Sequence, residues 1–151
     1  MRSSQDTVSH ASSELHVLAR RSELGVARKY AEDVAAAFGL DPDGRYEFVY
    51  AVNEAVTNAI RHGASDEEDM IHMSIGADAD RLTFCVRDRG TFVMPEVDTD
   101  ENSPGGRGLA LMASLVDEVD VHIDPGGTTV RLTKLRASLP SVLEPAHAQA
   151  G

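Results

Sequence analysis

A carboxylate, an amide and a guanidinium lie close together in one helical stretch of the sequence. The residues from Glu47 to Gly63 carry apolar side chains at the spacing of an amphipathic helix: Phe48, Val49, Val52, Ala55, Val56, Ala59 and Ile60. At about 100° per residue, Glu54 and Asn58 are one turn apart with Arg61 beside them, opposite the apolar stripe. Polar helix faces are usually just solvated. Here, however, two later glycine-containing segments favour a functional site.

Those two segments carry groups suited to bind an anion and a hydrogen-bond donor. The run from Gly105 to Gly108 immediately precedes an apolar helical pattern, LALMASLVDEV. Free backbone N–H groups and the positive end of a helix dipole therefore meet at one point, which is a ready anion site. Earlier, Asp88 and Gly90 interrupt a buried strand, and a carboxylate at neutral pH can only accept hydrogen bonds. Phosphate suits the first segment, and an amine donor suits the second.

Charge and composition exclude several function classes. The 151 residues include 25 acidic and 14 basic ones, and the formal net charge of -11 repels a phosphate backbone, so no nucleic acid partner is expected. The single cysteine, Cys85, excludes an internal disulfide, and its apolar run LTFCV predicts a buried, inert thiol. The six histidines have no ligand spacing. Neither a signal peptide nor a membrane span is visible, so we expect a cytoplasmic protein.

The order of predicted elements defines a single domain and its fold class. Helical stripes predict helices over residues 24–38, between Ser22 as N-cap and Gly39 as C-cap, over 47–63 and after Gly108. Alternating or continuous apolar runs predict strands near residues 15–19, 71–75, 82–86, 119–123 and 128–133. Helices so placed cover one face of a mixed, mostly antiparallel sheet, which is an α/β two-layer sandwich. We expect the domain over residues 14–136, a flexible lead-in over 1–13, a lid-like polar loop over 91–104 and a disordered tail over 137–151.

Four motifs in this order resemble the Bergerat-fold ATPases, the class that contains gyrase and the histidine kinases. Within the class, the chain is similar to the serine-kinase anti-sigma factors of bacteria, over about residues 15 to 136. The motifs are Glu54 with Asn58 on a helix, Asp88-Arg89-Gly90 after a buried strand, Gly106-Arg107-Gly108-Leu109 entering a helix, and Gly127-Thr128-Thr129-Val130 on the last strand.

The resemblance implies that the protein binds ATP together with Mg²⁺. It implies that Glu54 polarises the attacking nucleophile and that Asn58 holds Mg²⁺ bound to the phosphates. It also implies that Asp88 accepts a hydrogen bond from the adenine amino group, that Gly90 lets the base approach the backbone, and that Thr128 lies near adenine.

The same resemblance assigns the phosphates to the turn formed by Gly106, Arg107, Gly108 and Leu109. Two positions depart from the pattern of many relatives: Phe92 replaces a second glycine, and no basic residue lies between Arg89 and Arg107. The charge that reaches the γ-phosphate would then have to come from Arg107 or Arg61.

The sequence supports two functions from different classes. The first is an anti-sigma factor that binds a sigma factor and uses Mg-ATP to phosphorylate a Ser or Thr of an antagonist protein; a homodimer is implied by the resemblance. The second is an ATP-binding anti-sigma or scaffold module with negligible turnover. The catalytic half of a histidine kinase is disfavoured, because the segment around His10 is polar and Ser-rich and shows no phosphoacceptor helix pair.

Overall fold

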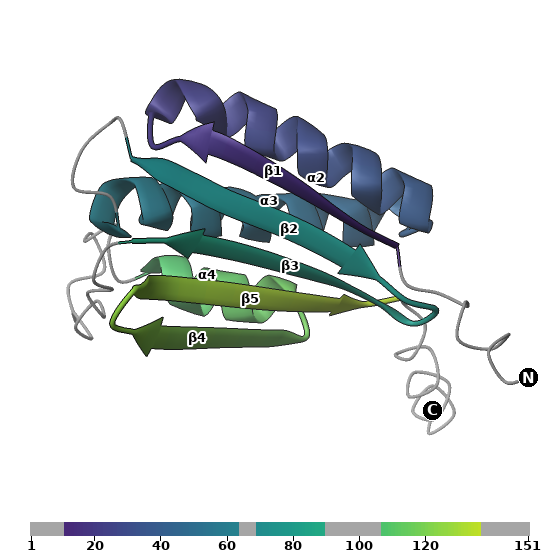
Figure 1. Cartoon of the computed structure of the whole chain (residues 1–151). Helices are drawn as coiled ribbons and strands as arrows, with labels where there is room; N and C mark the ends of the chain where they lie inside the picture. Colours follow the sequence, from purple (N-terminus) through teal and green to yellow (C-terminus); the bar gives the residue numbers. More distant parts are fainter. Residues whose placement is uncertain (1–10, 64–68, 90–106, 137–151) are drawn as a thin grey trace, which may run out of the picture.

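The computed structural model describes residues 11–63, 69–89 and 107–136, and Figure 1 shows their arrangement. In chain order the elements are β1 (Ala11–Leu18), η1 (Arg21–Glu23), α2 (Leu24–Phe38), α3 (Pro42–Asn58), η2 (Ala59–Gly63), β2 (Met70–Ala77), β3 (Arg81–Asp88), α4 (Arg107–Leu115), β4 (Glu118–Asp124) and β5 (Gly127–Leu135). β1 begins ahead of residue 14, where the domain was expected to start. The lead-in before residue 11, the tail and the lid-like loop lie outside the described residues.

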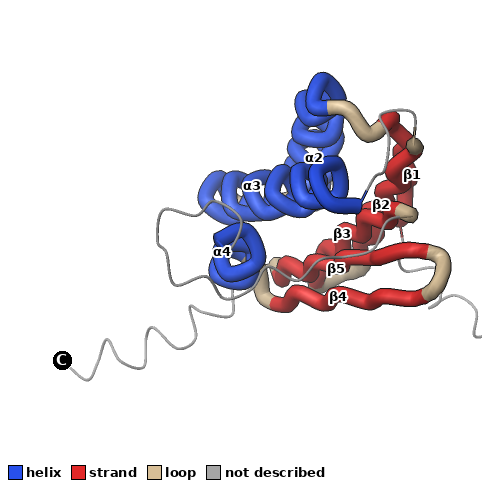
Figure 2. Tube along the Cα trace, turned by 90° about the vertical axis from the view of Figure 1, so that its left-hand side faces the viewer, coloured by secondary structure: helices blue, strands red, loops and turns tan. Residues whose placement is uncertain are grey.

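The five strands form one sheet in the order β1-β2-β3-β5-β4, and each pairing among these strands is antiparallel. Helices α2, α3 and α4 all lie on the same side of the sheet, and Figure 2 shows this arrangement edge-on. The opposite face has no second layer among the described elements. The predicted α/β two-layer sandwich is confirmed.

Helix α2 forms where the small apolar residues predict it. Ala27, Ala31 and Ala35 are fully buried at a four-residue spacing, so one narrow stripe of the helix packs against α3. The helix ends at Gly39, whose φ of 97° is left-handed and whose N–H donates to the carbonyl of Ala35 at 3.1 Å. The glycine C-cap is therefore confirmed.

Both long helices begin differently from the prediction. Ser22 lies inside the 3₁₀ turn η1, so the residue before α2 is Glu23, which makes no side-chain cap bond. The second long helix was predicted from residue 47, because the Asp-Pro and Asp-Gly pairs of the preceding LDPDG segment (residues 40–44) are turn signals. In the structure, α3 begins at Pro42, within this segment. Asp41 is the N-cap, its side chain accepts from the N–H of Gly44 at 2.7 Å, and Pro42 occupies the first turn. An Asp-Pro pair suits a turn and a helix start equally well, which explains the error.

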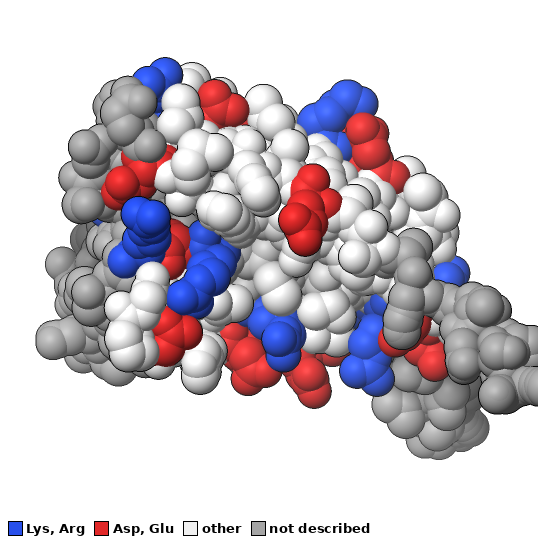
Figure 3. Space-filling view, in the orientation of Figure 1, with Lys and Arg blue, Asp and Glu red and all other residues white. Residues whose placement is uncertain are grey.

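The sheet alternates between a core face and an open face, and this alternation corrects the prediction for Cys85. Leu82, Phe84 and Val86 of β3 are buried beneath the helices, whereas Cys85 is only partly buried on the open face. The apolar run had suggested burial on both sides, but only one side of the sheet is covered. Figure 3 shows acidic and basic side chains interspersed on the open face, as expected of a solvated surface.

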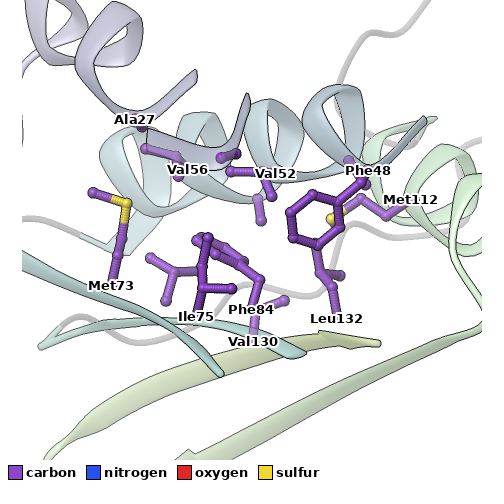
Figure 4. Packing of buried hydrophobic residues seen from close by; sticks show 14 of the residues in the cluster. Ala27, Phe48, Val52, Val56, Met73, Ile75, Phe84, Met112, Val130 and Leu132 are labelled. Atoms are coloured by element: carbon purple, nitrogen blue, oxygen red, sulfur yellow. The ribbon is translucent and has the colours of Figure 1, made fainter. Parts of the chain in front are cut away.

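One hydrophobic core joins the sheet to the three helices. Figure 4 shows Phe48 of α3, Met112 of α4 and Leu132 of β5 pointing toward one another. Each of these side chains is at most 1% exposed. The core therefore fixes α3 and α4 on the sheet and places their ends. Among the described residues, no helix combines the length and the apolar character that crossing a membrane requires.

Candidate active site

The segments that carry the four motifs come together at one end of the molecule. In Figure 1 the end of α3 with η2, the end of β3, the start of β5 and the start of α4 all lie at the left. The ends of β3 and β5 are adjacent because Asp88 and Thr128 are cross-strand partners. In addition, η2 contacts β3, and α4 packs against α3. Residues far apart in the sequence thus border one region.

Glu54 and Asn58 are one turn apart on α3, and both are half-buried. A neighbouring polar residue has a different orientation: the side-chain oxygen of Asn53 accepts a hydrogen bond from Arg28 of α2 at 3.3 Å. Because consecutive helical residues differ by about 100°, Glu54 and Asn58 are turned away from this contact with α2. The carboxylate of Glu54 and the amide of Asn58 therefore lie on the same side of the last turn of α3.

The α-helix changes character directly after Asn58. Residues Ala59–Gly63 form the π-helix η2, a rare geometry found mostly at functional sites. Its wider turn changes the angular phase of the side chains, so the spacing that predicted Arg61 beside Asn58 does not hold beyond Asn58. Arg61 is exposed. Its assignment to the site rests on the sequence alone.

Asp88 and Thr128 are a buried polar pair at the end of the sheet. They are directly opposite each other on β3 and β5, with 7% and 2% exposure. Both lie on the helix-covered face, in line with the buried residues Val86 and Val130. A carboxylate at the rim of an apolar core is held rigidly, which suits recognition of one particular donor.

Gly127 approaches the backbone of Asp88 more closely than any other residue type could. Its φ is 146°, and a Cβ added there would collide with the carbonyl oxygen of Asp88 and lie 2.9 Å from the Cα of Arg89. The sequence interpretation placed Gly127 in a motif but gave it no role. The sequence does hold one signal for this role, the second glycine of the Gly126-Gly127 pair. Its meaning becomes clear only from the pairing of β5 with β3.

The phosphate-side motif is described in part. Gly90 and Gly106 lie outside the described residues. Arg107, Gly108 and Leu109 form the first turn of α4, and of these three residues the structure describes the backbone only. The helix predicted at the glycine run is present, but it begins at Arg107, inside the run, rather than after Gly108. The free N–H groups of that first turn are at the same end of the molecule as Asp88.

An ion pair on the open face braces the same end of the sheet. Arg87 donates to both carboxylate oxygens of Asp124, at 3.0 and 3.3 Å, and to the hydroxyl of Thr129 at 2.9 Å. The N–H of Gly126 also donates to Asp124 at 2.7 Å. The bond from Arg87 is the main reason why the pKa of Asp124 lies below its usual value. The pair ties the β4–β5 turn to β3, just before Gly127, and no sequence pattern had indicated it.

A surface hollow of about 480 Å³ lies elsewhere, between α2 and the first half of α3. Its lining includes Glu32, Ala36, Arg45 and Tyr46, none of which belongs to a motif. Tyr46 is 65% exposed, so the hollow is shallow and open. The candidate active site is therefore the end of the molecule that carries Glu54, Asn58 and Asp88.

The fold and these motifs define a class of protein. A family model described as the histidine kinase-like ATPase domain matches residues 17–134, and the chain belongs to that family. In a solved structure of the RsbU and RsbW domains of Rv1364c from Mycobacterium tuberculosis, the similar region has a TM-score of 0.63 and 25% identity. It covers 83% of this chain and 33% of that longer chain.

Sequence relatives narrow the class. The serine-protein kinase RsbW of Bacillus licheniformis is 34% identical over 129 residues, which cover 77% of this chain and 80% of the relative. RsbW of Bacillus subtilis (strain 168) is 33% identical over 80% of this chain and 83% of the relative. An anti-sigma F factor of Thermoanaerobacter sp. (strain X514) is 33% identical over 70% and 82%. Within the ATPase class, the chain thus belongs to the family of the RsbW serine-protein kinases and anti-sigma factors.

The described residues fit an ATP site. The buried acceptor Asp88 and the close backbone approach at Gly127 form a rigid wall for a planar base with an amine donor. Within the described ranges, no group of three His, Cys, Asp or Glu side chains could hold a metal ion by itself. Asn58 would hold a Mg²⁺ in company with phosphate oxygens and water, which are ligands that Mg²⁺ usually keeps.

Proposed function

We propose that the protein binds Mg-ATP and transfers the γ-phosphoryl group to a Ser or Thr hydroxyl of an anti-sigma factor antagonist. In the same proposal it binds a sigma factor in the cytoplasm and forms a homodimer. The names of the relatives support this role, since they are serine-protein kinases and an anti-sigma factor. The negative net charge of -11 agrees with protein partners rather than nucleic acid.

The observation that carries the proposal is the buried pair Asp88 and Thr128, set at the same end of the molecule as Glu54 and Asn58. One side of the region presents a fixed acceptor for an amine. The other presents a carboxylate and an amide on one helical turn. Nucleotide-dependent phosphorylation needs a group that recognises the base and a group that accepts a proton. In this proposal Asp88 with Thr128 takes the first role and Glu54 the second.

Each described residue then has a separate role. Asp88 accepts a hydrogen bond from the adenine amino group, with Thr128 beside it. Asn58 binds Mg²⁺, which neutralises the phosphate charge. Glu54 accepts the proton of the acceptor hydroxyl as its oxygen attacks the γ-phosphorus and the bond to ADP breaks. The first turn of α4 orients the phosphates, and Arg107 or Arg61 supplies the positive charge near the γ-phosphate.

The test is to incubate the purified protein with γ-labelled ATP and candidate antagonist proteins encoded beside it. We expect label on one Ser or Thr of an antagonist, located by mass spectrometry of the peptide. ATP binding without transfer to any candidate would favour the ATP-binding anti-sigma module instead. Absence of ATP binding would overturn both readings.

A further inference from the structure

Lys134 of β5 joins three elements that border the active site. Its ammonium donates to the carboxylate of Glu47 on α3 and to the backbone carbonyl of Leu115 at the end of α4, each at 2.8 Å. The Lys134 side chain is 13% exposed, and that of Glu47 is 42% exposed. A mostly buried ammonium with two strong acceptors has a well-defined position.

The contact satisfies a specific need of α4. The last carbonyl groups of a helix have no partner within the helix, and a positive charge there also interacts favourably with the helix dipole. Leu115 is the last residue of α4, so Lys134 caps that end. Two residues further on, Asp117 adds two more bonds to β5: it donates its N–H to the carbonyl of Thr133, and its carboxylate accepts from the N–H of Leu135.

The opposite end of α4 is the start of the phosphate-side motif at Arg107 and Gly108. Polar bonds to β5 thus fix the carboxyl end of the helix, and the buried Met112 packs its middle onto the core. A helix of 9 residues is a short rod of roughly 13 Å. Because such a rod moves as one body, its fixed end determines where the N–H groups of its first turn lie.

We propose that Lys134 is a positioning residue for the nucleotide phosphates, acting through α4. By fixing how far α4 reaches along its own axis, Lys134 places the first turn of the helix where it can bind the phosphates. Adenine is bound independently by β3 and β5. This inference rests on the proposed function. It adds a residue that contacts neither base nor phosphate and whose loss affects only the phosphate part of recognition.

The experiment compares ATP and adenosine as probes in calorimetric titration of the full chain. We expect Lys134→Met to weaken ATP binding roughly tenfold, as for a lost charge-assisted hydrogen bond, and to leave adenosine binding unchanged. Lys134→Arg, which keeps both donors, should restore part of the ATP affinity. Glu47→Gln keeps an acceptor without the charge, so it should show a smaller loss with the same selectivity.

The matched control is Lys29→Met, which removes an exposed ion pair to Asp33 on α2 at 3.1 Å and should change neither affinity. Thermal melts establish that each variant is folded. If Lys134→Met does not fold, Glu47→Gln is used for the test instead.

Wild-type affinity for ATP in a folded Lys134→Met variant would overturn the inference. A parallel loss of ATP and adenosine binding would also overturn it, since that is the result of a merely structural role. A wild-type protein that binds no ATP would instead overturn the proposed function, and this inference with it.

Discussion

Gly127 of β5 lies against the peptide backbone of Asp88 on β3, leaving no space for a side chain. Its φ of 146° is also a conformation that other residues rarely adopt. The two effects act together, because the strand start must approach β3 this closely for Thr128 to pair with Asp88. The glycine thus determines the geometry around Asp88 and Thr128, the proposed base-binding pair, rather than simply allowing a turn.

We therefore expect Gly127→Ala to reduce the free energy of unfolding by about 1–3 kcal/mol and to weaken adenosine binding as this pair is displaced. Urea unfolding and calorimetric titration would measure the two effects. Gly25→Ala is the matched control: it lies in α2, where the nearest atom to a new Cβ is a guanidinium nitrogen of Arg28 at 3.9 Å. That change should leave binding intact and stabilise the helix by up to about 1 kcal/mol.

Asp88→Asn keeps the shape of the side chain but replaces an acceptor-only group by an amide. If Asp88 accepts from the adenine amine, ATP affinity should fall roughly 10- to 100-fold, the value of a hydrogen bond to a charged group. The preference for ATP over GTP should shrink as well, because the discriminating acceptor is gone. Competition binding with both nucleotides gives the answer, with the exposed turn residue Asp80 changed to Asn as the control. Unchanged nucleotide preference would remove Asp88 from the adenine role.

Much of this fold follows from periodicity in the sequence. The helical stripe of α2 with Gly39, and the apolar run from Leu82 to Val86 in β3, predicted both elements correctly. Errors arose where one pattern suits two structures: Asp41-Pro42 served as a helix start rather than a turn, and Cys85 lies on an open face rather than in the core.

Contacts between distant residues left no trace in the sequence. Arg87 and Asp124 are 37 residues apart, and Glu47 and Lys134 are 87 apart, so each pair depends on strand register and helix placement. Gly127 likewise acquires its role only through pairing with β3. Candidate site residues could be proposed from the sequence because chemistry fixes their types, whereas the residues that position them could not.

The ion pair between Arg87 and Asp124 makes stability depend on pH. The pKa of Asp124 is lowered in the folded protein, first by the hydrogen bond from Arg87 and then by that from Gly126, so the folded state favours the carboxylate. This stabilisation is present above the ordinary value of 3.8 and is lost as the pH falls through the lower folded value. Asp124→Asn should therefore be less stable than wild type at pH about 7, and the difference should shrink below pH about 4. Urea midpoints across this range measure it; a difference independent of pH would contradict the assignment.

Glu54 decides between a kinase and an ATP-binding module. In the proposed site, the carboxylate of Glu54 would repel the phosphates that Asn58, through Mg²⁺, and the first turn of α4 would attract, so its presence there favours a catalytic role. General bases typically contribute about 10²- to 10⁴-fold in rate, and Glu54→Gln should lower phosphorylation of the antagonist by that factor. ATP affinity should stay the same or rise, because the substitution removes a negative charge and keeps the shape. Glu32→Gln on α2, exposed and outside the motifs, is the matched control and should leave both quantities unchanged. Equal phosphorylation rates for wild type and Glu54→Gln would exclude Glu54 as the base. A rate that falls only in proportion to ATP affinity would assign the carboxylate to nucleotide binding instead.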